Sequence, residues 1–346
     1  TTQSARLLND GTVTGNGSTA QNYGPAMFVA QGWPGDRDVV LVLGTSVGFG
    51  SEDRGLLVDS RGNSGYLARG LDETASGKRS VTHHNWCVAS SSAINATGTG
   101  SGAFANRDAV IQAIKALNNN QLPFTKIISE HGVNDSNTAS PSTMQSRVQN
   151  WLDFLNTQYG VPLIQSLWPP RATTSSGTGF NSAAVQTATS LHTYPNDAQW
   201  VVDAFIRTTP SPIVGFIDPV PYFSDSTNRD KFKTNGFSTT IAANASISAT
   251  SVSLTAAPDV GETLAFGVGA AGTLDMGAAL APLVVTAVSG TGPYTVTLAY
   301  PLLKAQTNGA TVTSSATLDG THPSHTLHVN AVAAVVTAKT SGLLSA

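Results

Sequence analysis

Three side chains that together can carry out nucleophilic catalysis stand far apart in the sequence. Ser46 ends the segment Gly44-Thr45-Ser46, which directly follows an apolar run, and Asp319 and His322 lie three positions apart near the other end. A serine hydroxyl becomes a nucleophile when a histidine takes its proton and a carboxylate orients that histidine. The residue types therefore predict a hydrolytic triad of Ser46, His322 and Asp319.

Each part of this pattern also has an ordinary structural interpretation. A serine placed after a strand often caps a helix. Asp319 followed by Gly320 is a favourable turn sequence, and His322 then lies in solvent beside a helix start. The chemical interpretation gains weight only if the fold brings these segments to one place.

A fourth candidate, Asn134, follows another apolar segment within Gly132-Val133-Asn134-Asp135. A side-chain amide at the end of a buried strand can donate a hydrogen bond to an oxyanion, which typically contributes a factor of roughly 10²–10³ in rate. The alternative is an Asx turn, which Asn-Asp favours.

The segments that must position these residues alternate between apolar runs and stretches of helical spacing. Such alternation predicts βαβ units and a parallel sheet, whose carboxyl-end turns are the usual place for a site. Residues 51–69 are weakly patterned and predict a helix with a loop. The expected strands cover residues 39–43, 80–89, 125–130, 161–167 and 213–217, and the expected helices cover residues 105–117, 141–159, 198–206 and 327–338.

The character of the sequence changes between residues 237 and 316, where helical spacing gives way to short Val- and Thr-rich segments separated by turns. This pattern predicts a small all-β module inserted into the α/β domain. The predicted organisation is an extended lead-in over 1–36, a discontinuous hydrolase domain over 37–236 and 317–346, and the β module over 237–316.

Taken together, the motifs resemble those of the SGNH (GDSL-like) hydrolase family in type and order. Gly44-Thr45-Ser46 resembles the first block, Gly132-Val133-Asn134-Asp135 the third, and the segment from Asp319 to Ser324 the last. The resemblance implies a flavodoxin-like three-layer α/β/α sandwich with a parallel sheet of about five strands. It also implies a serine esterase with Ser46 as nucleophile, His322 as base and Asp319 as its orienting acid, without a metal or other cofactor.

The sequence departs from the family pattern at two positions. Thr45 replaces the usual Asp of the first block, which predicts altered local hydrogen bonding. In the second block, the usual glycine that contributes a backbone N–H aligns best with Ser90. The implied oxyanion hole therefore consists of the Ser46 and Ser90 N–H groups and the Asn134 amide.

Other residues at the expected sheet edge are candidates for contact with a substrate. His131 lies beside Asn134, and Trp168 and Arg171 follow the fourth expected strand. The alternatives are a structural hydrogen bond for His131 and a rigid loop with a packed tryptophan. Adjacent histidines on a strand point to opposite faces, so His83-His84 does not predict a metal site.

The composition narrows the choice of partner. The net charge of −3 gives no basic surface for nucleic acid, no apolar run is long enough to span a membrane, and only 11% of residues are charged. The polar, weakly charged composition favours an extracellular, virion or cell-surface protein. No signal segment is visible in the sequence. We expect an O-acetyl esterase acting on an acylated small molecule or polysaccharide, with the β module binding glycan or mediating self-association. The alternatives are a lipase or general carboxylesterase, and a non-enzymatic surface or virion adhesion module.

Overall fold

The computed structural model describes residues 37–53, 64–74, 77–96, 104–137, 139–174, 179–269, 274–278 and 281–345. All of them belong to one unit, Pro34–Ala346. The predicted lead-in over 1–36 lies outside the described residues.

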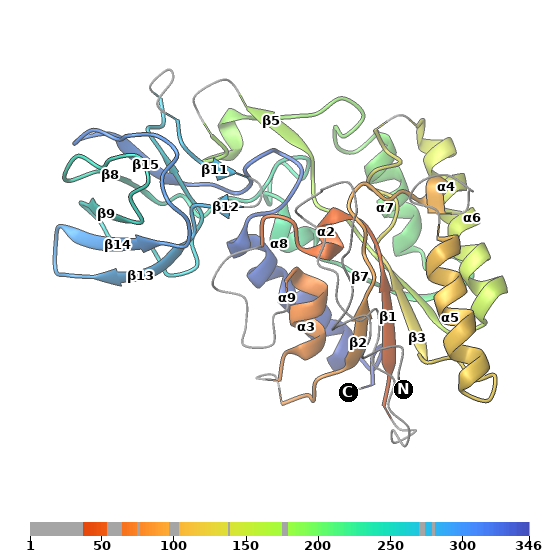
Figure 1. The fold of residues 1–346 in the computed structure, drawn as a ribbon. Coiled ribbons are helices and arrows are strands. Elements are labelled where there is room, and N and C mark those ends of the chain that lie inside the picture. The colour runs from red at the N-terminus through yellow and green to blue at the C-terminus, as the bar shows by residue number, and fades with distance from the viewer. Residues whose placement is uncertain are drawn as a thin grey trace. The chain divides into compact units, whose positions relative to one another are not determined.

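The centre of this unit is a sheet of five parallel strands (Figure 1). The strand order is β2-β1-β3-β4-β7, which is the 2-1-3-4-5 order of flavodoxin-like folds. The prediction of a parallel sheet of about five strands is therefore confirmed. The strands are β1 (Val39–Leu43), β2 (Thr82–Asn85), β3 (Lys126–Ser129), β4 (Leu163–Ser166) and β7 (Ile213–Ile217).

The apolar run of β1 is continuous because both faces of this strand are covered. Leu41 and Leu43 belong to the core on one side of the sheet, whereas Val40 and Val42 belong to the core on the other side. Successive side chains of a strand point to opposite faces, so a central strand with two buried faces needs an apolar residue at every position. The strand order places the end of β1, and Ser46 after it, between the ends of β2 and β3.

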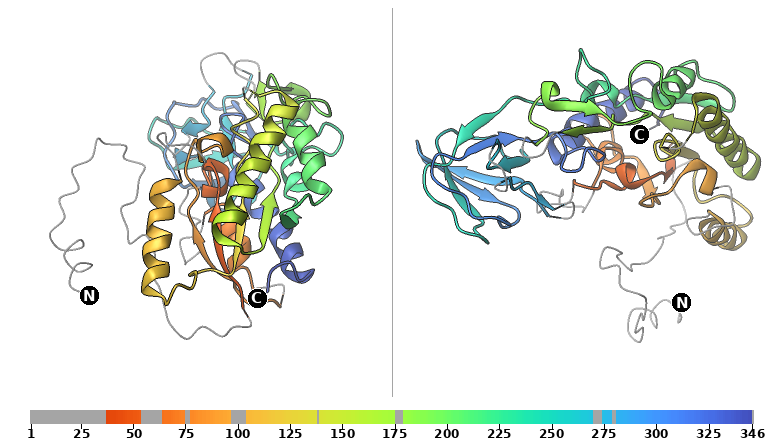
Figure 2. Two further views of the ribbon diagram at one scale, coloured as in Figure 1. Left: turned by 90° about the vertical axis from the view of Figure 1, so that its right-hand side faces the viewer. Right: turned by 90° about the horizontal axis from the view of Figure 1, so that it is seen from above.

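Helices cover both faces of the sheet and complete the three-layer sandwich (Figures 1 and 2). One core contains residues from α5, α6 and α7, and the other contains residues from α3 and α9. The described helices of the sandwich are α2 (Ser46–Phe49), α3 (Tyr66–Asp72), α4 (Ala93–Ala96), α5 (Ala105–Leu117), α6 (Pro141–Tyr159), α7 (Ala198–Arg207), α8 (Val220–Phe223) and α9 (His325–Thr340).

The bounds of helix α6 can be read from the sequence, because residues that favour a helix start and a helix end stand at its two ends. The Ser140 side chain accepts a hydrogen bond from the Thr143 N–H, and Pro141 occupies the first helical position. Gly160, at φ 64°, ends the helix in the left-handed conformation. The predicted bounds of α6 are confirmed, as are those of α5, β1 and β7.

Segments with weaker local signals differ from their predicted bounds. Strand β2 is shorter than the predicted 80–89, and helix α3 occupies only the end of the weakly patterned region predicted over 51–69. Part of that region lies outside the described residues. No helix in the described part of the chain has the length and hydropathy required to cross a membrane.

Between α8 and α9 the chain forms antiparallel sheets with a core of their own. The sheet orders are β10-β15-β8, β13-β14-β9 and β11-β12, and the core includes Leu254, Phe266, Val285 and Val296. Figure 2 shows these strands in cyan to blue. They are β8 (Ser238–Thr240), β9 (Ser251–Leu254), β10 (Leu264–Phe266), β11 (Gly277–Ala278), β12 (Ala281–Pro282), β13 (Val285–Ser289), β14 (Tyr294–Leu298) and β15 (Thr311–Ser314).

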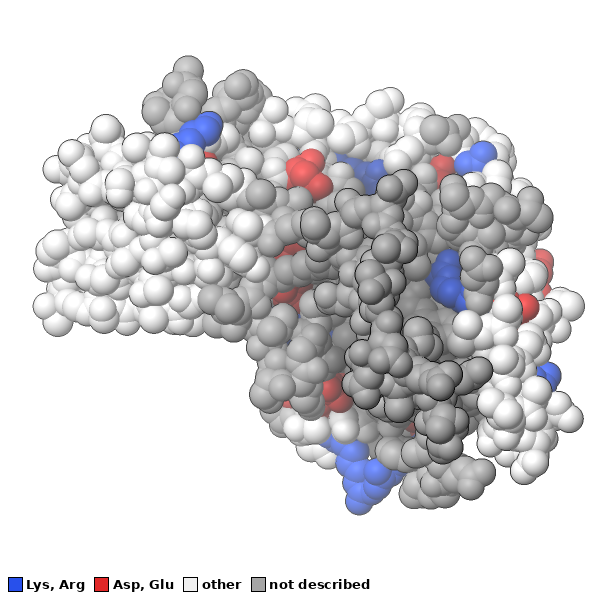
Figure 3. Space-filling model, viewed as in Figure 1, with Lys and Arg blue, Asp and Glu red and all other residues white. Residues whose placement is uncertain are grey.

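The surface of this β module is almost free of charge. Residues 237–316 contain only Asp259, Glu262, Asp275 and Lys304 as charged residues. The face in Figure 3 is accordingly white over most of the module. After β15 the chain returns to the sandwich, where the Ser324 N–H donates to the Ala316 carbonyl and the Thr326 hydroxyl donates to the Gly261 carbonyl. The segment from Asp319 to His322 lies in this return.

Smaller elements follow the fourth strand of the main sheet. Strands β5 (Ala172–Thr174) and β6 (Gln186–Ala188) pair in antiparallel fashion, and a short 3-10 helix (Ala183–Val185) precedes β6. The Ala172 N–H donates a hydrogen bond to the Gly320 carbonyl at 2.9 Å. This bond joins the β5–β6 hairpin to the loop that carries Asp319 and His322.

Candidate active site

Ser46, His322 and Asp319 form a continuous chain of hydrogen bonds. The distance between Ser46 Oγ and His322 Nε2 is 2.7 Å, and the distance between His322 Nδ1 and Asp319 Oδ2 is also 2.7 Å. The histidine can therefore take the serine proton at one nitrogen while the carboxylate holds the proton at the other. The fold brings together three residues that are separated by up to 276 positions.

The end of β1 fixes the place of Ser46. Helix α2 begins at Ser46, and the Thr45 side chain caps it by accepting a hydrogen bond from the Val47 N–H. A Cβ atom on Gly44 would lie 2.6 Å from Oε2 of Glu130, so this position has room only for glycine. The backbone thus turns sharply from strand to helix and presents the Ser46 hydroxyl at the carboxyl edge of the sheet.

The loop before α9 holds Asp319 rigidly. Its Oδ1 atom accepts hydrogen bonds from the Thr321 and His322 N–H groups at 2.8 and 2.9 Å. The Asp319 side chain is 39% exposed. Its partial removal from water alone would raise its pKa, but the hydrogen bonds and charge of His322, with these backbone donors, lower the pKa to about 2. Asp319 is therefore ionised at neutral pH. Gly320 has a φ of 75°, and a Cβ there would overlap the Ala172 carbonyl.

Thr45, which stands in place of the family's Asp, is buried against a second carboxyl group. Both the Thr45 N–H and its hydroxyl donate to Glu130, at 2.7 and 2.8 Å to Oε2. Glu130 has no exposed surface, and burial raises its pKa to about 7 although the hydrogen bonds from Thr45 oppose this rise. The turn before Ser46 is therefore tied to β3 through a carboxyl group that titrates near neutral pH.

Replacing Glu130 with glutamine is expected to change the pH dependence of stability. The folded protein retains a proton on Glu130 that the unfolded chain releases above its ordinary pKa of 4.5. The stability of the wild type relative to E130Q should therefore fall as pH rises from about 4.5 to about 7, by about 3 kcal/mol. Urea unfolding of both proteins at pH 5 and pH 8 measures this difference. An equal difference at both pH values would contradict the assignment.

Asn134 lies where the sequence predicts it, after β3, and two contacts fix its amide. Its Oδ1 accepts a hydrogen bond from Arg171 Nη2 at 2.6 Å, and its Nδ2 donates to the Ser91 carbonyl at 2.8 Å. Arginine only donates hydrogen bonds, so the amide oxygen must face Arg171. One hydrogen on Nδ2 is left for another acceptor.

Ser90 adopts the backbone conformation that favours glycine. Its φ is 63°, in the left-handed region. The sequence pattern has glycine at the position aligned with Ser90, and glycine adopts this conformation without steric cost. In the described part of the chain, no acceptor pairs with the Ser90 or Ser46 N–H.

The remaining three candidates for substrate contact are buried, which corrects the expectation that they line the site. His131 and Trp168 have no exposed surface, and Arg171 is 8% exposed. His131 hydrogen-bonds the Ser91 hydroxyl, and Trp168 donates to the Glu130 carbonyl. Burial lowers the pKa of His131 to about 3, so this ring is neutral. Arg171 binds Asn134 and Asn137, and it therefore acts on the site through Asn134.

Trp168 also explains a glycine of the third block. A Cβ on Gly132 would lie 2.3 Å from Trp168 Cζ2, and Gly132 has a φ of 135°. The backbone must therefore approach the indole ring closely. A large side chain that supports the turn before Asn134 gives the same sequence signal as one that contacts substrate.

The histidines of the final helix are packing residues. His325 bonds Asp53 at 2.6 Å, and His328 stacks near Tyr66. Asp53 also pairs with Arg69, so this network joins α3 and α9 behind the site. Cys87 is buried, and burial raises the pKa of its thiol well above the ordinary value.

The sequence reasoning missed Glu52, which lies beside the triad. Ligand-type atoms of Glu52, Asp319 and His322 lie within 4.8 Å of one another. Both ring nitrogens of His322 already face Ser46 and Asp319, so neither is left for a metal ion while the triad is intact. No local sequence signal marks Glu52, because its partner lies more than 260 positions away.

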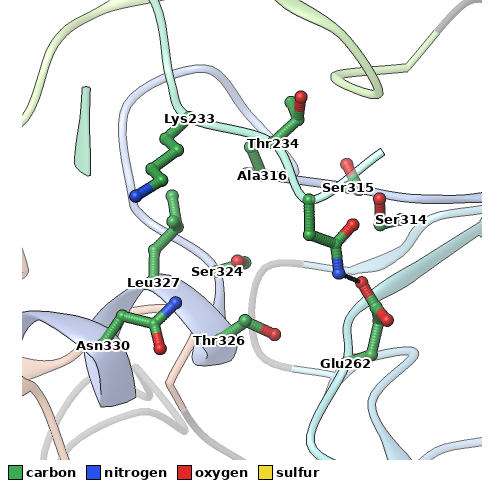
Figure 4. A pocket seen from close by; sticks show the side chains of 11 residues that line it. Lys233, Thr234, Glu262, Ser314, Ser315, Ala316, Ser324, Thr326, Leu327 and Asn330 are labelled. Atoms are coloured by element: carbon green, nitrogen blue, oxygen red, sulfur yellow. Dashed lines mark hydrogen bonds between the residues drawn. The ribbon is translucent and has the colours of Figure 1, made fainter. Parts of the chain in front are cut away.

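A polar hollow lies elsewhere, between the β module and α9 (Figure 4). Lys233, Glu262 and Asn330 are among its lining residues, and a neighbouring hollow of about 240 Å³ includes His325. Among the described residues, no lining hydroxyl is hydrogen-bonded to a histidine there. The arrangement required for nucleophilic catalysis is therefore found at Ser46 and not in this hollow.

Comparisons with known proteins return similarity only at the level of structure. No protein-family model and no curated protein matches the chain. Among solved structures, a protein described as lipolytic and of the G-D-S-L family, from Desulfitobacterium hafniense, shows 16% identity over 55% of this chain and 82% of its own, with a TM-score of 0.34. The carbohydrate acetylesterase Est24 from Sinorhizobium meliloti shows 12% identity over 57% and 91%, with a TM-score of 0.36. An aryl esterase from M. smegmatis shows 11% identity over 56% and 90%, with a TM-score of 0.35.

The fold class rests on the chain's own topology. The parallel order β2-β1-β3-β4-β7, with helices on both faces, makes a flavodoxin-like α/β/α sandwich. The first and last motif blocks of the sequence resemblance meet through the bond between Ser46 and His322. Asn134 of the third block follows β3, the strand beside β1.

Proposed function

We propose that this protein is a serine esterase that forms an acyl-enzyme on Ser46. The observation that carries the proposal is the unbroken chain from Ser46 Oγ through His322 to Asp319, with 2.7 Å at each step. Such a chain can generate a serine nucleophile at neutral pH without a metal ion.

The first half of the reaction transfers the acyl group to Ser46. Ser46 Oγ attacks the ester carbonyl carbon while its proton passes to His322 Nε2, and ionised Asp319 stabilises the imidazolium through Nδ1. The carbonyl oxygen becomes an oxyanion, which the Ser46 and Ser90 N–H groups and the Asn134 amide stabilise. His322 then gives its proton to the leaving alcohol as the ester C–O bond breaks.

The second half returns the enzyme to its starting state. A water molecule loses a proton to His322 Nε2 and attacks the acyl carbon, and the same donors hold the second oxyanion. The bond to Ser46 Oγ breaks, the serine regains its proton from His322, and the carboxylic acid leaves. Arg171 supports both halves, because its bond to Asn134 Oδ1 keeps the amide N–H group available.

We further propose that the acyl group is acetyl and that the alcohol is part of a carbohydrate. Two features support this choice over long acyl chains. The chain has few charged residues, and the added β module carries four of them in 80 positions. An extracellular, virion or cell-surface location fits such a substrate. The rival substrates are lipids and other acyl esters.

A panel of esters tests the choice of substrate. We expect kcat/KM for p-nitrophenyl esters to be highest for acetate and to fall as the acyl chain lengthens, and we expect acetate release from an acetylated polysaccharide. Free acetate is measured with a coupled assay, and a de-acetylated sample of the same polysaccharide serves as the control. A maximum at medium or long chains would favour the lipase alternative and exclude the acetylesterase.

A further inference from the structure

Glu52 is a buried acidic residue with unusual local geometry. It follows helix α2, its side chain has no exposed surface, and its φ is 65°. A non-glycine residue in the left-handed region is sterically unfavourable and persists only where surrounding contacts hold it. Such positions are enriched at functional sites. The geometry at Glu52 therefore requires an explanation from its contacts.

The contacts of Glu52 point to the triad. Its Oε2 accepts a hydrogen bond from the Leu318 N–H at 2.9 Å, which brings the carboxyl group to the residue before Asp319. Its Oε1 is buried without a hydrogen-bond partner. Within the described ranges, no lysine or arginine forms an ion pair with Glu52. Ligand-type atoms of Glu52 and Asp319 lie within 4.8 Å of one another, and the repulsion between two negative charges at this distance favours a proton on one of them.

The hydrogen bonds decide which of the two is protonated. Asp319 receives two backbone N–H groups and the His322 ring, all of which stabilise its charged form. Glu52 accepts from the Leu318 N–H, with a smaller contribution from the Asp319 N–H, and it lies in a dry environment. Burial and the nearby Asp319 charge raise the pKa of Glu52 well above its ordinary value, whereas the pKa of Asp319 is lowered to about 2.

On the basis of the proposed esterase function, we propose that Glu52 is a neutral positioning residue that donates its carboxyl O–H to the Asp319 carboxylate. The chain of hydrogen bonds then runs from Ser46 through His322 and Asp319 to Glu52. The hydrogen bond from Glu52 keeps the Asp319 carboxylate turned toward His322 Nδ1 and confines a single negative charge to the pair. The unpartnered Glu52 oxygen supplies the atom for this bond.

This role predicts an alkaline limit on activity. When Glu52 ionises, the O–H donor is lost and a second negative charge appears beside Asp319, so the pair can no longer hold its geometry. Among the described residues, few charged or titratable groups lie near Glu52, since the adjacent Asp53 is turned toward Arg69 and His325. These groups are Asp319 and His322, in the loop before α9. His328 of α9 hydrogen-bonds the neighbouring Ser51 carbonyl, and Arg171 interacts electrostatically with Asp319.

Two substitutions separate positioning from packing. Glu52→Gln replaces the O–H with an amide N–H that cannot ionise, and Glu52→Leu fills similar space without a donor. We expect E52Q to retain kcat within about threefold and to lose the alkaline fall of the wild type. We expect E52L to lower kcat by about tenfold or more with little change in KM, because the defect lies in the transition state. Thermal unfolding shows whether each variant is folded.

Asp203→Asn is the matched control, because Asp203 is also a buried carboxyl group with a pKa raised to about 6, but it lies on α7 and bonds Arg207. Its pH profile should match that of the wild type. Equal pH profiles for E52Q and wild type, or an equal loss of kcat in E52Q and E52L, would overturn the inference. Loss of activity on chelation with recovery in Ca²⁺ would also overturn it, since a bridging ion would then replace the proton.

A spectroscopic measurement distinguishes failure of this inference from failure of the proposed function. The infrared difference spectrum between wild type and E52Q at pH 8 should contain the carbonyl band of a protonated carboxyl group, whether or not the protein hydrolyses esters. Absence of that band rejects a neutral Glu52. If the band is present in a protein that hydrolyses no ester, both the esterase function and the positioning role are rejected. Only the conclusion that Glu52 is protonated would then stand.

Discussion

Ser46→Ala is expected to lower kcat for an aryl acetate by roughly 10⁴- to 10⁶-fold, because removal of the nucleophile leaves only the oxyanion donors and substrate binding. Within the described ranges, the Ser46 side chain hydrogen-bonds only His322, so the fold should be retained. The measurement is steady-state hydrolysis at pH 8 together with thermal unfolding. Stoichiometric labelling of wild type, but not of S46A, by a fluorophosphonate would place the nucleophile directly.

The matched control is Ser289→Ala, at the exposed end of β13 in the β module. This substitution also removes a serine hydroxyl group, but from the β module and not from the triad, and it should leave kcat unchanged. A wild type that hydrolyses no activated acetate ester, or an S46A variant with full activity, would reject the triad. The first result would favour the alternative of a non-enzymatic surface or virion module.

Asp319→Asn is expected to lower kcat by roughly 10³- to 10⁴-fold at neutral pH. Oδ1 of the new asparagine can still accept the Thr321 and His322 N–H groups, so the loop should keep its conformation. The amide nitrogen would replace Oδ2 and donate to His322 Nδ1. This donation stabilises the tautomer whose Nε2 carries a proton, and that tautomer cannot accept the proton of Ser46.

Hydrolysis of the same ester between pH 5 and pH 9 measures this effect. Asp153→Asn on the exposed face of α6 is the control, because it makes the same chemical change at an exposed carboxylate that accepts a hydrogen bond from Gln149. In the wild type, Asp319 has a pKa of about 2 and stays ionised throughout this range, so its own titration should not limit activity. A loss of less than tenfold in D319N would show that Asp319 does not select the tautomer.

Much of the fold is readable from local sequence because local chemistry fixes it. Helix α6 begins at a capping serine and ends at a glycine, and the apolar run of β1 can only be a strand buried on both faces. The order of the motif blocks along alternating strands and helices then leads to one sheet edge. The positions of Ser46, Asn134, Asp319 and His322 relative to the elements were predictable for this reason.

The supporting residues were not predictable in the same way. Trp168 and His131 follow strands at the correct edge, as a substrate-binding residue would, but tertiary packing buries both. Arg171 reaches Asn134 across 37 positions. The role of Thr45, which stands where the sequence pattern usually has an aspartate, is visible only in the tertiary structure, where its hydroxyl donates a hydrogen bond to Glu130.

The sequence by itself determined the class of fold, the order of its elements and the identities of the nucleophile, base and acid that we propose. Periodicity, caps and motif order are short-range properties, and one chain carries them in full. Only the tertiary structure decided which carboxyl groups meet. Glu52 lies beside Asp319, Glu130 lies against Thr45, and the burial that shifts their proton affinities arises from contacts between distant segments. No local pattern encodes that burial.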